Sequence, residues 1–453
     1  MGLLVRNGLL VTEEGIRKAD LLIENEKISR LEPNIEEKTG DQVIDAGGKY
    51  VLPGVIDAHV HYHMKTAEGR TADSFETGSL SAAFGGVTSY IDFASPVEGK
   101  SLLEALKERQ NEAAGHSYLD YSFHMEITGE FEQDVDELPK IKSQGITSLK
   151  IYTTYGSTQL LDPQISALLK KAREESMLVM VHAEDDNIIS RRKQEFIATG
   201  KVQPRYHAAS RPEEAEIKAI GRLVEMAEAE RAALYIAHVS TGKGAQIIRR
   251  AKAKGESVYG ETCPHYLLLS DECYNSEESQ KYIMTPPLRK REDQEALWQS
   301  LSGDTLQCIA TDHCAFHLRD KLKSESCFDV LPGIGGSETL LPLMYSEGVA
   351  KGRISLVHLV RLLSSNPARI FGLYPQKGAL MEGSDGDVVI FDPGREVVLK
   401  GSELHSASGY TVFEGMKLKG YPAATLLRGK VLCMDGMQVA EKPEGIFVKA
   451  NKE

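Results

Sequence analysis

The sequence has few of the features that stabilise small secreted domains or cross a membrane. Its 453 residues include only six cysteines, and none of them forms a C-x-x-C pair. In a chain of this length, such usage indicates reduced cytoplasmic thiols and argues against a disulfide framework or a structural zinc site. No apolar segment approaches the roughly 18 to 20 residues that span a bilayer. We therefore expect a cytoplasmic protein without a membrane partner.

Positive charge is also scarce. The chain carries 53 basic against 66 acidic residues, which gives a formal charge of -13. Its one dense basic run, at residues 288–291, is short and is typical of a solvated loop. Because nucleic-acid binding depends on Lys and Arg side chains gathered against phosphates, we expect no nucleic-acid partner.

The two ends of the chain share a pattern that the middle lacks. Residues 1–51 and 379–453 alternate short Val, Ile and Leu runs with Gly and Asp turns. Such runs predict strands, and helical periodicity is absent from the first of the two segments. We therefore expect a small β-sandwich assembled from both ends, with residues 52–378 as a separate domain between them.

The middle domain alternates apolar runs of strand length with amphipathic helical segments, such as residues 101–114, 162–176 and 211–230. The apolar runs are eight in number, at residues 54–61, 87–95, 119–128, 147–155, 177–185, 232–240, 256–264 and 305–313. Eight such units predict an α/β fold of the (β/α)8 TIM barrel type, although an open doubly wound sheet has the same local pattern.

Three histidines crowd the end of the first run, in "GVIDAHVHYH" at residues 54–63. Residues two apart in an extended chain point the same way, so His59 and His61 can converge on one point. Other polar residues end further runs of the series, namely Lys150, His182, His238 and Asp312. Barrel enzymes place their chemistry at this end of the strands, which favours a closed barrel.

Four histidines, one aspartate and one lysine can surround two divalent metal ions. The set is rich in nitrogen and free of thiols, so zinc is the first choice, with manganese, iron and cobalt open. Lys150 fits only as a carbamate formed with carbon dioxide, because an ammonium would be repelled by the cations. Taken singly, each residue has a simpler interpretation: a core histidine, a helix N-cap for Asp312, or a snorkelling side chain for Lys150.

Six short motifs resemble those of the cyclic amidohydrolases, on the branch with hydantoinase, dihydropyrimidinase and allantoinase. They are "DAHVHYH", "SLKIY", "VHAED", "YIAHVS", "ETCPHY" and "ATDH", in this order along the chain. The resemblance implies that His59, His61 and Asp312 bind one metal, that His182 and His238 bind the other, and that carboxylated Lys150 bridges them. It also implies a homotetramer, with a homodimer as the alternative.

The resemblance further implies hydrolytic ring opening of a small cyclic imide. A hydroxide held between the metals would attack, and the product of a 5-substituted hydantoin or a dihydropyrimidine would be an N-carbamoyl amino acid. Asp312 is expected to act as general base and then as general acid, and Tyr155 to donate a hydrogen bond to the developing oxyanion.

Substrate contacts are expected from Tyr155, Met64, Thr285 in "TPPLR" and Asp329 in "DVLPG". Segments such as "EGRT" and "GIGGSETLLPLM" resemble allantoinase, so conversion of allantoin to allantoate is the main alternative. The branch also includes dihydropyrimidinase-related proteins that lack the metal ligands and act in assembly. This chain keeps all six ligand positions, which favours an enzyme.

Overall fold

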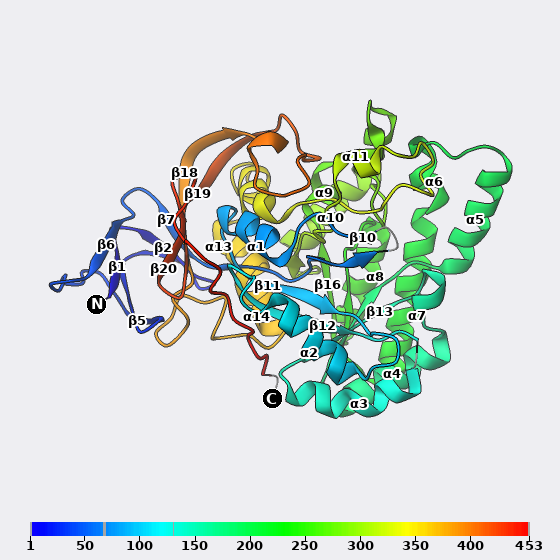
Figure 1. The fold of residues 1–453 in the computed structure, drawn as a ribbon, viewed down its shortest axis with the longest axis horizontal. Helices are drawn as coiled ribbons and strands as arrows, with labels where there is room; N and C mark the ends of the chain where they lie inside the picture. The colour runs from blue at the N-terminus through cyan, green and yellow to red at the C-terminus, as the bar shows by residue number, and fades with distance from the viewer. Residues whose placement is uncertain (1, 67–68, 130, 452–453) are drawn as a thin grey trace.

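The computed structural model describes residues 2–66, 69–129 and 131–451. It consists of a barrel of parallel strands wrapped by helices, with a smaller body of mainly antiparallel sheet at one side (Figure 1). Strands from both chain ends, blue and red in Figure 1, lie together in the smaller body. The predicted combination of a TIM barrel with a β-sandwich built from both ends is therefore confirmed.

The barrel contains eight parallel strands in the order β17-β16-β15-β14-β13-β12-β11-β8. They are β8 (Val55–Asp57), β11 (Val87–Ala94), β12 (Asp120–Glu126), β13 (Ser148–Tyr152), β14 (Leu178–His182), β15 (Leu234–Ile236), β16 (Val258–Thr262) and β17 (Cys308–Ile309). Each lies inside one of the predicted apolar runs. A parallel bridge between Val60 and His313 joins the first strand to the last, and the His61 N–H donates to the His313 carbonyl at 2.8 Å. The sheet is thus closed.

Helices cover the outside of the barrel. Those of eight residues or more are α1 (Phe75–Phe84), α2 (Leu102–Ala113), α3 (Phe131–Ser143), α4 (Asp162–Glu174), α5 (Asp186–Ala198), α7 (Glu213–Glu230), α8 (Gly242–Ala253) and α10 (Arg291–Ser302). The three predicted amphipathic segments form α2, α4 and α7. A capping box of Ser101 and Glu104 begins α2, because it satisfies backbone N–H groups that the first turn leaves free. Within the described residues, no helix combines the length and hydropathy that a membrane span requires.

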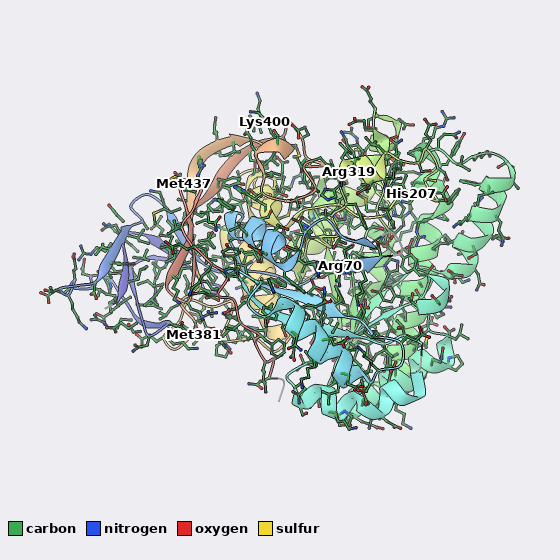
Figure 2. All side chains as sticks on the ribbon, viewed as in Figure 1. Arg70, His207, Arg319, Met381, Lys400 and Met437 are labelled. Carbon is green, nitrogen blue, oxygen red and sulfur yellow. The ribbon has the colours of Figure 1, made fainter. Side chains whose placement is uncertain are left out.

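Shorter helices surround the barrel mouth and follow the last strand. They are α6 (His207–Ser210), α9 (Pro264–Leu268), α11 (Leu318–Lys321), α12 (Leu340–Met344), α13 (Leu356–Val360) and α14 (Asn366–Ile370). A two-stranded hairpin of β9 (Lys65–Thr66) and β10 (Gly69–Arg70) also lies beside the mouth. Arg70 and His207 mark this region in Figure 2.

The smaller body contains two sheets. The four-stranded sheet has the order β5-β4-β1-β6, with β1 (Leu3–Arg6), β4 (Asp20–Glu24), β5 (Lys27–Glu32) and β6 (Gln42–Asp45). The other has the order β21-β20-β19-β18-β7-β2-β3, with β2 (Leu9–Val11), β3 (Ile16–Lys18), β7 (Tyr50–Pro53), β18 (Val388–Val398), β19 (Lys417–Leu427), β20 (Lys430–Met434) and β21 (Met437–Gln438). Leu21 and Ile23 of one sheet share a buried cluster with Val388 and Leu426 of the other. That shared core makes the pair a sandwich.

We propose the division into residues 1–51, 52–378 and 379–453 as the domain organisation. Strand β7 crosses the first boundary, since it pairs with β2 and β18 in the sandwich and ends at Pro53. The barrel begins at β8, one residue after Gly54. A Cβ added at Gly54 would lie 1.9 Å from the Thr88 hydroxyl, so only glycine fits at this crossing between the two domains.

Candidate metal centre

His59 and His61 follow β8 and point toward one aspartate. Their Nε2 atoms lie 3.2 and 3.1 Å from Asp312 Oδ1, the His59 ring is fully buried, and the two rings pack edge to face. Asp312 follows β17 with a positive φ of 50°. The structure thus brings these three predicted ligands together at the barrel mouth.

Lys150 lies inside β13 and is 1% exposed. Its Nζ is 3.5 Å from His59 Nε2 and 4.9 Å from the centre of the Phe93 ring. No carboxylate of the described residues lies within ion-pair distance of it. Burial lowers the pKa of Lys150, because a charged amine loses its hydration there. The neutral amine that this favours is the form that reacts with carbon dioxide.

His182 ends β14 and His238 follows β15. His182 Nδ1 faces His238 Nε2 at 3.0 Å. Burial lowers the pKa of both imidazoles, and it holds the pKa of His59 well below its ordinary value. Neutral imidazoles are the form that binds metal ions.

The donor atoms of the site converge. One ligand atom each from His59, His238 and Asp312 lies within 4.8 Å of the others. Burial raises the pKa of Asp312, but the surrounding imidazoles outweigh this and hold it well below its ordinary value. A carboxylate that faces several imidazole nitrogens fits a divalent cation between them, because such a cation satisfies all these lone pairs at once.

Two buried carboxylates behind the site were not singled out from the sequence. Glu261, in β16, lies 2.5 Å from His59 Nδ1 and accepts a hydrogen bond from the Tyr235 hydroxyl at 2.9 Å. When Glu261 is ionised, it accepts the His59 proton on Nδ1 and leaves the Nε2 lone pair toward Asp312. Burial raises the pKa of Glu261 to about 8. The sequence signal that could have identified Glu261 was its place at the start of the motif "ETCPHY".

Glu184 is the second of these carboxylates. It lies 2.8 Å from His182 Nε2 and pairs with Arg211. This contact places the His182 proton on Nε2, so that Nδ1 faces His238. The Arg211 guanidinium also lies 5.4 Å from the centre of the Tyr155 ring. The acid two residues after His182 in "VHAED" was the signal available in the sequence.

Tyr155 reaches the same site from the loop after β13. It adopts a positive φ of 75°, and its hydroxyl lies 2.6 Å from Thr285 Oγ1 and 3.2 Å from His182 Nε2. The residue is 37% exposed, so its ring stands at the cavity wall. Burial of the hydroxyl end raises the pKa of Tyr155, which leaves it a neutral donor at physiological pH.

A cavity of about 170 Å³ holds these groups. It is lined by His59, His61, Met64, Lys150, Tyr152, Tyr155, His182, His238, His265, Met284, Thr285, Asp312, Cys314, Pro332, Gly333 and Ile334. All six predicted metal ligands and the predicted contacts Met64, Tyr155 and Thr285 are among them.

Asp329 is the one predicted site residue that does not line the cavity. Its N–H donates to the Ser326 carbonyl at 2.9 Å in a turn, and its side chain is exposed. In the motif "DVLPG", the residues that line the cavity are Pro332 and Gly333. The turn holds Asp329 away from them. Sequence position alone did not reveal the turn.

The Thr285 loop lines the cavity and has unpaired backbone groups. Met284 carbonyl lies 2.8 Å from His207 Nε2, and Pro286 carbonyl accepts from the Tyr266 hydroxyl at 2.6 Å. Between these anchors, the N–H and C=O of Thr285 make no hydrogen bond within the described part of the chain. A donor and an acceptor from one residue are therefore available to a ligand.

Another acidic cluster lies at the opposite end of the barrel. Asp120, at the start of β12, approaches Asp385 and Asp387, and all three are buried. The Lys377 ammonium lies between them at 2.5, 2.9 and 2.7 Å. Arg428 also pairs with Asp120, and Lys27 with Asp385, so three cations balance the three carboxylates and the cluster joins the barrel to the sandwich by ion pairs.

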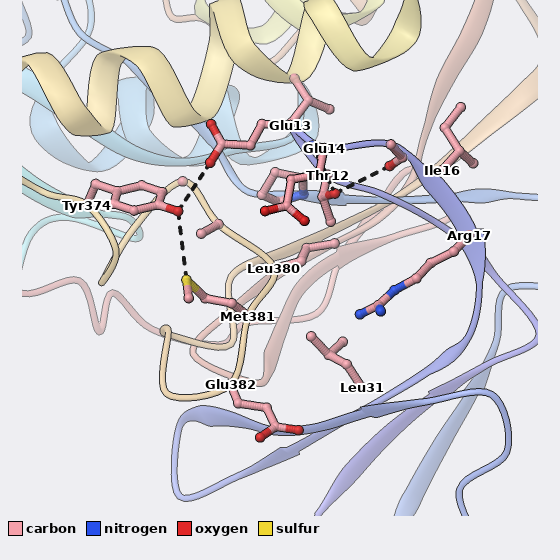
Figure 3. Close-up of a pocket in the computed structure, with 15 residues that line it drawn as sticks. Thr12, Glu13, Glu14, Ile16, Arg17, Leu31, Tyr374, Leu380, Met381 and Glu382 are labelled. Atoms are coloured by element: carbon pink, nitrogen blue, oxygen red, sulfur yellow. Dashed lines mark hydrogen bonds between the residues drawn. The ribbon is translucent and has the colours of Figure 1, made fainter.

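A larger cavity, of about 630 Å³, lies between the turn that joins β2 to β3 and the segment before β18 (Figure 3). The Tyr374 hydroxyl donates to Glu13 at 3.2 Å and faces Met381 Sδ at 3.9 Å. None of the described residues that line it is histidine or cysteine. It therefore lacks the donor set of the cavity at the barrel mouth.

Comparison with known proteins agrees with this geometry. A D-phenylhydantoinase from Escherichia coli O1:K1 / APEC is 40% identical, over 99% of this chain and 98% of that protein. A D-hydantoinase from Ralstonia pickettii is 37% identical, over 100% and 99%. The crystal structure of dihydropyrimidinase from Brevibacillus agri NCHU1002 is 36% identical, with a TM-score of 0.97 over 99% of both chains. The model of the amidohydrolase family matches residues 50–432. The chain therefore belongs to the amidohydrolase family, on its hydantoinase and dihydropyrimidinase branch.

Proposed function

We propose that this enzyme opens 5-substituted hydantoins or dihydropyrimidines by hydrolysis and releases N-carbamoyl amino acids. The observation that carries the proposal is the convergence of four imidazoles, Asp312 and Lys150 on one cavity beside the free backbone groups of Thr285. The names of the relatives point to the same class of substrate. A cyclic imide edge carries a carbonyl beside an N–H, which complements the N–H and C=O of a single residue.

His59, His61 and Asp312 would hold one divalent ion, and His182 and His238 the other. A carbamate on Lys150 would supply the negative charge that a bridging ligand needs. When bound, the ions would lower the pKa of the attacking water from 15.7 to about 7 and polarise the carbonyl under attack. Zinc suits the nitrogen-rich donor set best.

Asp312 and Tyr155 have separate tasks in this scheme. Asp312 takes the proton of the attacking water and delivers it to the ring nitrogen, so that the C–N bond breaks with a neutral amide as leaving group. The low pKa of Asp312 keeps its carboxylate ionised. Tyr155 donates its hydroxyl proton to the oxygen that gains charge, and Thr285 Oγ1 at 2.6 Å orients that hydroxyl.

We further propose a cytoplasmic homotetramer. The location is supported by the six cysteines, none of which is paired in the described chain. Sedimentation of the purified protein measures the subunit number, with a homodimer as the alternative outcome.

The first experiment is a hydrolysis panel on protein supplied with metal and bicarbonate. Dihydrouracil, a 5-aryl hydantoin and allantoin are compared by kcat/KM. We expect dihydrouracil or the 5-aryl hydantoin to be preferred, in line with the names of the relatives; allantoin carries the same imide edge, so the panel tests the group at the 5-position. Faster turnover of allantoin would instead assign the enzyme to allantoinase chemistry, and no turnover of any ring would reject hydrolysis of cyclic ureides.

Replacement of Lys150 tests the proposed carbamate. Lys150→Ala removes the only side chain that can bridge the ions in this way, so we expect metal content to fall below two ions per chain and activity to fall by at least about 10³-fold. Metal analysis and kcat/KM are measured on the same sample. Full metal content together with full activity would reject the bridging role.

A further inference from the structure

Lys321, the last residue of α11, is fully buried near the cavity but does not line it. Its ammonium donates to the carbonyls of Ile283 at 2.7 Å, Gly333 at 2.6 Å and Leu331 at 3.2 Å. A buried charge is costly unless hydrogen bonds satisfy it. The side chain is therefore placed where three carbonyls, rather than a carboxylate, compensate its charge.

The three acceptors belong to two loops that form one wall of the cavity. Ile283 precedes Met284 and Thr285, while Leu331 and Gly333 flank Pro332. The loops also touch directly, since the Gly333 N–H donates to the Ile283 carbonyl at 3.0 Å. Lys321 thus donates hydrogen bonds to Ile283 and to Gly333, the two residues whose backbone contact joins the loops.

Gly333 shows how closely this wall is packed. Its φ is +155°, and a Cβ at this position would lie 2.3 Å from the Cys314 carbonyl oxygen. A side chain therefore has no room at this position of the wall. Without the Lys321 contacts, the Gly333–Ile283 hydrogen bond would be left to hold the two loops together.

The number of donors explains why a lysine is needed. Three carbonyls converge on one nitrogen, and only the protonated amine offers three N–H groups. Burial lowers the pKa of Lys321 to about 7, and hydrogen bonds to the three carbonyls are made best by the charged form. An uncharged or shorter side chain leaves at least one buried carbonyl without a donor.

We propose that Lys321 is a positioning residue for substrate binding: it fixes the spacing between the Thr285 and Gly333 loops, and thereby aims the free N–H and C=O of Thr285 at the imide edge. The inference rests on the proposed function, because only an enzyme that binds cyclic imides would use the Thr285 N–H and C=O to contact an imide edge. Lys321 touches neither the metal ligands nor Tyr155, so its effect falls on binding.

The test compares Lys321→Met and Lys321→Gln with the wild type on the preferred imide. We expect KM to rise about tenfold with kcat within about twofold, since the lost contacts hold ground state and transition state alike. Metal content stays at the wild-type value. Gln keeps two N–H donors, so we expect Lys321→Gln to raise KM less than Lys321→Met does. Lys321→Gln also provides the test if the Met variant does not fold.

Lys377→Met is the matched control. Lys377 is as buried as Lys321, but it bonds to carboxylates at the other end of the barrel. The Lys377→Met substitution is expected to lower the thermal midpoint of unfolding without changing KM. If both Lys321 variants lower the midpoint and leave KM unchanged, as this control does, the positioning role is rejected.

Amide hydrogen exchange separates this inference from the proposed function. Faster exchange at residues 283–285 and 331–334 in Lys321→Met, and not in Lys377→Met, supports the tie between the loops without any substrate. Unchanged exchange in both segments overturns it. Wild-type protein that hydrolyses no cyclic imide would reject the proposed function, while the exchange result would still decide whether Lys321 fixes these loops.

Discussion

Two buried carboxylates decide which nitrogen of each histidine faces the cavity. Glu261 accepts from His59 Nδ1, and Glu184 faces His182 Nε2, so opposite nitrogens of the two rings are left for a metal. A ring that is hydrogen-bonded at its far nitrogen has a fixed tautomer and a fixed orientation. The site therefore depends on residues that contact no substrate.

Glu261→Gln tests this dependence. The amide keeps the volume but loses the charged acceptor, so we expect metal affinity to fall by about 10- to 100-fold. Metal retained after dialysis against a series of chelator concentrations gives the measurement. Glu216→Gln is the control, because Glu216 is an equally buried carboxylate that bonds to Ser240 and Thr241 away from the cavity. Equal metal retention in both variants would contradict the role given to Glu261.

The sequence predicted the residues that end strands and three cavity residues in the loops beyond them, but it did not single out the buried residues that support the site. His59 and Asp312 stood out because a polar side chain that ends an apolar run is unusual. Glu261 and Lys321 did not, since a single acid or lysine has no pattern of its own until the fold brings its partners together. Asp329 was assigned by its motif, and the turn at Ser326 directs it to the surface.

At the scale of elements, the C-terminal tail acts as an added strand on the barrel. Residues 445–451 form no named element, yet their N–H groups donate to the carbonyls of Ser117, Tyr121, Gly145 and Gly372. Phe447 forms a parallel bridge with Tyr121 at the start of β12. The tail therefore closes the end of the barrel that lies opposite the metal ligands.

Removal of residues 445–453 tests the tail. The lost backbone bonds contribute about 1 kcal/mol each, so we expect a lower thermal midpoint. The metal content and KM of protein that remains folded should not change, because no hydrogen bond of the described residues 445–451 reaches a residue that lines the cavity. Gly445→Ala is a milder version, since its Cβ would lie 1.9 Å from the Leu119 carbonyl. A midpoint equal to that of the wild type in both variants would show that the tail carries no stability.

The strands and helices of the barrel were predictable because each has its own periodicity. The order of the sandwich strands was not. Strand β1 pairs in parallel with β6, and β7 pairs with both β2 and β18. These choices depend on which faces can be buried together, and a run such as "LLVRNGLLV" is equally apolar in every arrangement.

At the scale of the whole molecule, Asp73 connects the barrel mouth to the C-terminal segment. It accepts from His313 Nε2 at 3.0 Å, from Ser406 Oγ at 2.5 Å and from the Ala407 N–H at 2.8 Å. Burial raises the pKa of Asp73, but these donors outweigh it and lower the value to about 2. The carboxylate is thus more stable in the folded protein than in the unfolded chain.

The sign of this shift predicts acid sensitivity. The pKa of Asp73 is lower in the folded protein than its ordinary value of 3.8, so the ionised carboxylate stabilises the fold at pH values above 3.8. The contribution is about 2 kcal/mol, and it is lost as the pH falls toward 2. The thermal midpoint of Asp73→Asn should lie below that of the wild type at pH 6, and the difference should shrink below pH 4. Asp136→Asn, at an exposed carboxylate of α3, is the control. A difference that does not change with pH would contradict the assignment.

The strand order of the seven-stranded sheet constrains how the protein is made. Strand β7 lies between β2, which is synthesised early, and β18, which begins at Val388. While the ribosome adds the barrel, the apolar faces of the N-terminal strands have no partner from the C-terminal segment. Exposed strand edges in such intermediates favour aggregation. The sandwich therefore cannot be completed until the segment that follows the barrel has been synthesised.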